Sequence, residues 1–162
     1  MLYLSQLLRL TPAKIRRNAQ RVRISKVKAS LDVDEKGPHK YFTADAKALD
    51  GVRHVTIRLY GPAAADGAMK LNNPVWVHCS CPYHKYYVEV ALAARGSSSV
   101  LLSNGRFPKI RNPGMRPYLC KHAVSAAPIA AKAKAKRRKV TQIDSLELEN
   151  LVKLLEPFIP KK

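Results

Sequence analysis

The chain has 162 residues, which is enough for one modest domain with its own core but not for two large ones. Lysine and arginine outnumber aspartate and glutamate by 30 to 11, and the formal net charge of +19 indicates an acidic partner, such as nucleic acid or an acidic protein surface. The three cysteines are too few, and odd in number, for a disulfide framework, which favours a reducing, intracellular setting.

The N-terminal segment MLYLSQLLRL is apolar over a short stretch only and contains Arg9. It is therefore too short and too charged for the hydrophobic region of a signal peptide or for a membrane span. We expect a protein that is not secreted through a signal peptide, that lies in the cytoplasm of a cell, and that has no membrane partner.

Basic residues are concentrated from the end of this segment onward, with eight of them in the stretch that runs from Arg9 to position 28. Thr11 followed by Pro12 is typical of a helix start and predicts a short basic helix over residues 12–20. We expect residues 1–21 to form a basic N-terminal arm. The residues of this arm expected to contact nucleic acid or an acidic partner are Arg16 and Arg17.

Three alternating apolar patterns predict strands. The first begins at Val22 and changes parity near Ser25, which indicates a bulge or a bend. The segment EKGPHKY then predicts a turn. The second strand is HVTIRLYG, which a Gly-Pro pair ends, and the third is PVWVHCSC. His39 and His54 are expected to be ordinary turn and strand residues.

Pro82 opens a predicted helix that Gly96 ends. Tyrosines and small apolar residues recur three and four positions apart along it. This stripe is explained either by a packed helical face or by a platform on which nucleic-acid bases stack. Glu89 lies on the same helix, and we expect it at the solvated surface.

Two closely spaced pairs of metal-ligating residues flank this helix. Cys79 and Cys81 are one residue apart, and Cys120 and His122 repeat that spacing downstream. Close pairs of thiolate and imidazole ligands are what a closed tetrahedral zinc site needs, and four protein ligands leave no position for water or substrate. The pattern therefore predicts one structural zinc ion and argues against a hydrolytic one.

Other interpretations of these residues stay open. Cys79 and Cys81 can also be apolar residues of a buried strand, because free cysteine packs like a small hydrophobic side chain. A redox pair fits less well, because such pairs are usually spaced Cys-x-x-Cys. His78 and His84 are expected to support the site or to lie on the surface, with His84 as the alternative ligand.

The segments CSCPY and CKHAVSA resemble the two halves of the SWIM-type zinc finger, which has Cys-x-Cys followed after an interval by Cys-x-His. The resemblance covers about residues 75–127. It implies a β-β-α unit in which Cys79, Cys81, Cys120 and His122 hold one zinc ion, and a role in binding DNA or protein within a larger machine. The interval is longer here than in compact members, because a helix and a loop are inserted.

The segment SNGRFPKIRNPGMRPYLCKH, which runs from the inserted loop to the second ligand pair, is similar to segments of small SWIM-bearing proteins of tailed bacteriophages. This similarity implies a place in a virus particle. No signature of a zinc deaminase, a phosphate-binding loop, a Gly-x-Ser-x-Gly elbow or a Rossmann glycine run occurs. We therefore expect no enzyme and no small-molecule substrate.

Two more basic clusters, one in the inserted loop and one in the segment KAKAKRRK, are expected to contact phosphates or acidic protein. Their residues are Arg106, Lys109, Arg111, Arg116, Lys132, Lys134, Lys136, Arg137, Arg138 and Lys139. A basic linker over residues 129–143 leads to an apolar stripe at helical spacing within residues 144–162, which predicts an amphipathic helix. This helix packs either on its own sheet or in a groove of another subunit.

These patterns together predict an α+β fold with a small antiparallel sheet. The sheet and a ββα-type zinc unit form a domain over residues 22–128, between a basic N-terminal helix and a C-terminal amphipathic helix. We interpret the protein as a noncatalytic structural subunit, held together by zinc, which binds neighbouring subunits of a larger assembly such as a phage virion. A free nucleic-acid-binding SWIM module is the alternative.

Overall fold

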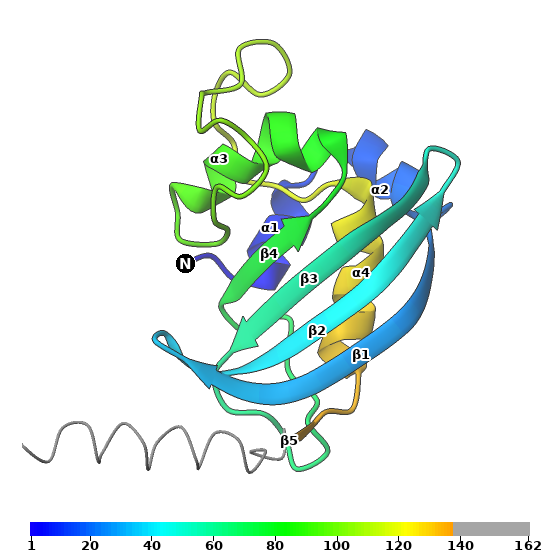
Figure 1. Ribbon diagram of the computed structural model, residues 1–162, viewed down its shortest axis with the longest axis vertical. Coiled ribbons are helices and arrows are strands. Elements are labelled where there is room, and N and C mark those ends of the chain that lie inside the picture. The colour runs from blue at the N-terminus through cyan, green and yellow to red at the C-terminus, as the bar shows by residue number, and fades with distance from the viewer. Residues whose placement is uncertain (138–162) are drawn as a thin grey trace, which may run out of the picture.

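The computed structural model describes residues 1–137 and confirms the predicted α+β class with a small antiparallel sheet (Figure 1). The helices α1, α2 and α4 lie on one face of the sheet. The elements are, in chain order, α1 (Leu4–Leu10), α2 (Ala13–Ala19), β1 (Arg23–Asp34), β2 (Gly37–Ala48), β3 (Gly51–Tyr60), β4 (Val75–Cys79), the π-helical turn η1 (His84–Val88), α3 (Glu89–Ala93), α4 (Lys121–Lys132) and β5 (Lys136–Arg137).

The sheet is an antiparallel meander with the strand order β4-β3-β2-β1, to which the two-residue strand β5 adds in parallel at the edge of β1. Across the central strands, Phe42 pairs with Ile57, and Ile57 pairs with Val77. All three side chains are fully buried and contribute to one hydrophobic core with α4. The alternation along β2, β3 and β4 therefore directs these apolar residues to the face that the helices cover.

The predicted irregularity in the first strand is a β-bulge. The register between β1 and β2 shifts between Ser25 and Lys28, and Lys26 adopts a left-handed backbone conformation with φ of 49°. An extra residue at this point bends the strand and changes which side chains face the core. The parity change near Ser25 in the sequence is thus confirmed as a bulge.

The strand β2 was not predicted, because its buried positions are not a run of large apolar residues. Its inward side chains include Lys40, Ala44 and Ala46, with only Phe42 as a large hydrophobic residue. Lys40 is fully buried, and its Nζ atom donates hydrogen bonds of 2.9 Å to the carbonyl oxygens of two residues at the C-terminal end of α4. Carbonyl groups at a helix end lack partners within the helix and attract a cation.

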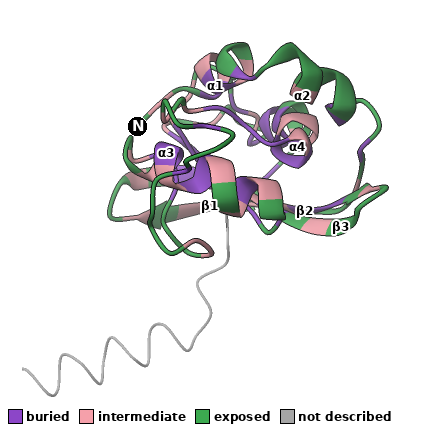
Figure 2. Ribbon diagram, turned by 90° about the horizontal axis from the view of Figure 1, so that it is seen from above, coloured by how far each residue is buried: buried purple, intermediate pink, exposed green. Residues whose placement is uncertain are grey.

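The N-terminal residues form part of the core, where we expected an arm. Leu4 and Leu7 of α1 are fully buried in the main hydrophobic cluster. Thr11 ends α1, and its hydroxyl donates to the carbonyl of Leu7 and accepts a 3.0 Å hydrogen bond from the backbone N–H of Leu119. The basic helix itself is confirmed as α2, which begins directly after Pro12 and is largely exposed (Figure 2).

The first part of the expected basic linker is folded onto the domain. Residues 129–132 are the last turn of α4, and the chain then passes so close to Gly67 that a Cβ atom there would collide with the backbone of Ala135. The C-terminal helix expected within residues 144–162 lies outside the described residues. Among the helices of residues 1–137, none is long and apolar enough to cross a lipid bilayer.

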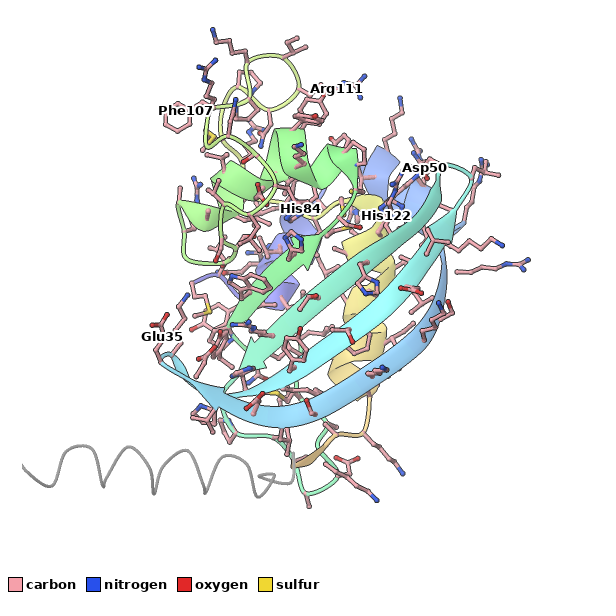
Figure 3. The ribbon with its side chains drawn as sticks, viewed as in Figure 1. Glu35, Asp50, His84, Phe107, Arg111 and His122 are labelled. Atoms are coloured by element: carbon pink, nitrogen blue, oxygen red, sulfur yellow. The ribbon has the colours of Figure 1, made fainter. Side chains whose placement is uncertain are left out.

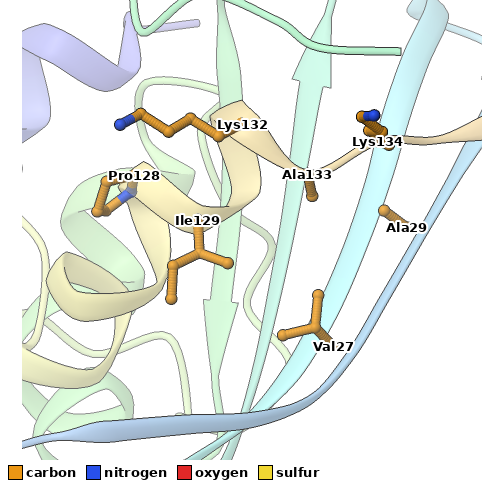
Figure 4. Close-up of a pocket in the computed structure, with 7 residues that line it drawn as sticks. All are labelled: Val27, Ala29, Pro128, Ile129, Lys132, Ala133 and Lys134. Carbon is orange, nitrogen blue, oxygen red and sulfur yellow. The ribbon is translucent and has the colours of Figure 1, made fainter. Parts of the chain in front are cut away.

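A groove of about 550 Å³ lies between β1 and the end of α4 (Figure 4). Most of its lining residues are apolar, and the two others are Lys132 and Lys134. The lining residues are Val27, Ala29, Pro128, Ile129, Lys132, Ala133 and Lys134.

Because α1 belongs to the core, truncating its buried face should destabilise the whole domain. We expect Leu7→Ala to lower the free energy of unfolding by about 2–5 kcal/mol, as is usual for removing a buried leucine side chain. Leu10, which is 50% exposed on the same helix, is the matched control. Leu10→Ala should change stability by no more than about 0.5 kcal/mol in the same urea titration. Equal effects of the two substitutions would contradict this placement of α1.

Candidate metal centre

The four predicted ligands come together where the sheet meets α4. Cys79 is the last residue of β4, and Cys81 follows it before η1. Cys120 is the N-cap of α4, and His122 lies in its first turn. One potential ligand atom of each side chain lies within 4.8 Å of the other three, and each residue is at most 1% exposed. Figure 3 shows His122 at the start of α4, between the helix and the sheet.

The chemistry of these four side chains fits a metal ion. Neither ring nitrogen of His122 has a hydrogen-bond partner among the described residues, although both are buried. Hydrogen bonds from Cys120 and from Cys79 lower the pKa of Cys81, whereas hydrogen bonds with Cys120 and Cys81 raise the pKa of Cys79. Three sulfurs at this separation repel one another as anions, and a divalent cation removes that repulsion. The donor set can therefore hold a metal ion without an open coordination position.

Asp50 is a further residue of this centre that sequence reasoning missed. It lies in the turn between β2 and β3, and its Oδ1 atom accepts a 2.7 Å hydrogen bond from Lys121 Nζ. The same oxygen lies 3.8 Å from His122 Nε2. The hydrogen bond from Lys121 lowers the pKa of Asp50 and favours its carboxylate form. The only signal in the sequence was the pair Asp50-Gly51, which is typical of a hairpin turn.

Glu89 is buried, so our expectation of a solvated surface position was wrong. Its carboxylate is 0% exposed and accepts hydrogen bonds from the backbone N–H groups of Leu101, Leu102 and Ser103 at 3.1, 3.0 and 2.7 Å. His84, which we considered as an alternative ligand, is also 0% exposed, and burial lowers its pKa to about 4. Its backbone N–H donates a 3.2 Å hydrogen bond to Cys81 Sγ.

The tyrosines after Pro82 are used mainly for packing. The rings of Tyr83 and Tyr87 lie 5.1 Å apart, and the hydroxyl groups of Tyr83 and Tyr118 are 3.1 Å apart. Arg111 from the inserted loop lies over the ring of Tyr87, at 5.4 Å from its centroid. Tyr86 is 57% exposed. This arrangement agrees with a packed helical face and leaves one tyrosine ring of the stripe open to solvent.

The predicted basic contact residues up to Lys136 are exposed but do not converge on one face. Figure 1 places the inserted loop and β5 at opposite ends of the molecule. We call the group in the inserted loop the loop surface, and the group that begins at the last residue of α4 the tail surface. The loop surface consists of Arg106, Lys109, Arg111 and Arg116, and the tail surface of Lys132, Lys134 and Lys136.

Of the remaining predicted contact residues, three lie within the described part of the chain and two lie outside it. Arg16 and Arg17 are exposed on α2. Arg137 is the second residue of β5, and it pairs with Leu31 of β1. Arg138 and Lys139 lie outside the described residues.

The position of Asp50 beside His122 predicts a role in metal affinity. We expect Asp50→Asn to weaken zinc binding by roughly 10–100-fold, as is usual when the carboxylate that supports a histidine ligand is lost. Glu35→Gln is the matched control, because Glu35 lies at the far hairpin of β1 and β2 (Figure 3). Competition with a chromogenic chelator measures both affinities. An unchanged affinity in Asp50→Asn would show that this carboxylate does not support His122.

No known protein family, curated protein or solved structure shows a significant match to this chain.

Proposed function

We propose that the protein is a noncatalytic subunit of a larger assembly, that one zinc ion holds its domain together, and that separate basic surfaces bind its neighbours. Zinc is the metal that best suits three thiolates and one imidazole in a closed tetrahedral set. Cys79, Cys81, Cys120 and His122 would supply the four bonds. The ion would provide folding energy and no reactive position, because the protein fills its coordination shell.

The proposal that this unit is SWIM-like is supported by the order of its elements. The paired strands β3 and β4 lead into Cys79 and Cys81, and α4 begins at Cys120. This is the order of a β-β-α unit with a ligand pair at each junction. The helix and loop between the two halves are an insertion on the same scaffold.

The observation that carries the proposed function is the separation of the loop surface from the tail surface. They lie beyond the two ends of α4, whose 12 residues span about 18 Å. One rigid domain therefore presents cations in two directions. A subunit that joins two acidic neighbours needs this arrangement, whereas a module that follows one duplex needs a contiguous basic stripe.

Apolar side chains exposed beside the loop cations favour protein as the partner. Phe107 is 70% exposed and Ile110 is 88% exposed, and both alternate with Arg106, Lys109 and Arg111 along the loop. Aromatic residues and arginine are enriched in protein interfaces. Phosphate backbones offer no apolar surface that would cover Phe107 and Ile110. The resemblance of this loop to bacteriophage proteins makes a virus particle the assembly that we propose.

Nucleic acid is the second candidate, and the exposed cations of α2 favour it. Lys14, Arg16 and Arg17 are exposed along one short helix that has no acidic residue in its first turn. Such a helix can contact phosphates without reading sequence.

A titration with duplex DNA separates the two candidates. For a subunit that binds proteins, we expect a dissociation constant weaker than about 10⁻⁶ M at physiological salt, in the range of nonspecific binding. A constant of about 10⁻⁸ M or tighter would instead identify a nucleic-acid-binding module. The logarithm of the association constant should then fall linearly with the logarithm of the salt concentration, with a slope of about −0.9 for each neutralised phosphate.

Matched variants show which surface carries any binding. Replacing Arg106, Lys109 and Arg111 by glutamine neutralises three cations of the loop surface, and replacing Lys132, Lys134 and Lys136 neutralises the tail surface. If the two surfaces bind different proteins independently, neutralising one surface should leave binding through the other surface intact. Equal and additive losses of DNA affinity in both variants would support the second candidate.

The amphipathic helix predicted within residues 144–162, after the basic tract, is proposed as a further anchor to a neighbour. We expect deletion of residues 144–162 to leave the melting temperature and zinc content of the domain unchanged, and to prevent recovery of the protein in purified particles. The competing outcome is a lower melting temperature. It would place the segment on its own domain, which offers an apolar groove between β1 and the end of α4 (Figure 4).

A further inference from the structure

A second cluster of metal-ligating side chains lies beside the cysteines. It consists of His78 from β4, His84 from η1 and Glu89 from α3, and one potential ligand atom of each lies within 4.8 Å of the other two. His78 Nδ1 is 3.8 Å from Glu89 Oε1. The rings of His78 and His84 meet edge to face, with their centroids 5.5 Å apart. Figure 3 shows His84 between β4 and the helical segment that follows it.

The imidazoles of this cluster have buried nitrogen atoms without partners. His84 is 0% exposed, and neither of its ring nitrogens has a hydrogen-bond partner within residues 1–137. The same holds for Nδ1 of His78. Buried polar atoms in proteins are almost always bonded, because an unpaired one loses its contact with water without compensation. One such nitrogen from each ring lies close to the Glu89 carboxylate, which indicates that a polar group or an ion binds between the three side chains.

The carboxylate of Glu89 is held in place but not neutralised. Its hydrogen bonds come from the backbone N–H groups of Leu101, Leu102 and Ser103, which are uncharged donors. Within the described residues, no lysine or arginine forms an ion pair with it, and its one ionic neighbour is the ring of His78. A fully buried carboxylate is normally paired with a cation or bound to a metal.

We propose that His78, His84 and Glu89 bind a second divalent transition-metal ion, through two imidazoles and one carboxylate, next to the Cys79 centre. Imidazole with carboxylate suits zinc and the neighbouring transition metals. Three protein ligands leave at least one position for water, and the His78 side chain, 17% exposed, gives access from solvent. This inference does not depend on the proposed partner of the protein.

A metal ion here would connect β4 to the loop surface. Glu89 binds the backbone at Leu101–Ser103, which is the start of the inserted loop. A cation that neutralises Glu89 would keep its carboxylate ionised and in contact with those N–H groups. The second ion would thus fix the base of the loop that presents Arg106 and Phe107.

The metal content of the full chain tests this proposal. After titration with zinc and gel filtration, we expect two equivalents in the wild type, and one in each of the variants His78→Gln and Glu89→Gln. His54→Gln is the matched control, because His54 is exposed, pairs with Asp45 and lies outside both clusters; it should retain two equivalents. One equivalent in the wild type, or two in His78→Gln, would overturn the proposal.

Cobalt(II) in place of zinc distinguishes the two centres and reports folding. Thiolate-to-cobalt charge-transfer absorption should saturate at one equivalent, and the second equivalent should bind without increasing it. His78→Gln should keep the full absorption and lose the second equivalent. A changed d–d spectrum of the first cobalt equivalent in His84→Gln would instead make His84 a ligand of the first centre, and would refute the second site. If a variant loses the charge-transfer band altogether, it has lost the cysteine centre and cannot test the second site. The number of zinc equivalents bound by the wild type then decides whether the second site exists.

Discussion

Three buried thiols and one buried imidazole converge at the junction between β4 and α4, and the rest of the domain is arranged around this junction. Hydrogen bonds among the thiols lower the pKa of Cys81 and raise that of Cys79, and the imidazole of His122 has no hydrogen-bond partner among the described residues. A metal ion would give all four side chains a bonding partner, and it would link Cys79, the last residue of β4, to the first turn of α4. The helix that covers the sheet would then be fixed at its N-terminal end by the ion and at its C-terminal end by Lys40.

This arrangement gives a small domain two rigid ends. α4 packs on β1, β2, β3 and β4, and the inserted loop and the tail surface lie beyond its two ends. The burial of Glu89 adds a second constraint, because its carboxylate organises the base of the loop. A binding surface on a loop binds its partner more tightly when the loop is held in one conformation beforehand, because less conformational entropy is lost on binding.

The sequence predicted the features that depend on local patterns. The ligand pairs, the bulge near Ser25 and the strands β3 and β4 follow from spacing and alternation, and the structure has them. The strand β2 was not predictable in this way, because a lysine occupies one of its core positions. Lys40 is buried there because it donates a hydrogen bond to a carbonyl at the end of α4, which is distant in the sequence. Glu89 and Asp50 were missed for the same reason. Their roles depend on backbone N–H groups and on a histidine that only the tertiary fold brings to them.

The dependence of the fold on a bound metal is the central claim, and chelation tests it most directly. The purified wild type should contain zinc, and removing the metal with an excess of chelator under reducing conditions should abolish the cooperative thermal transition followed by circular dichroism. Returning one equivalent of zinc should restore most of that transition, because binding to the cysteine centre supplies folding free energy. A metal-free protein that melts at the same temperature as the zinc-loaded one would contradict the account.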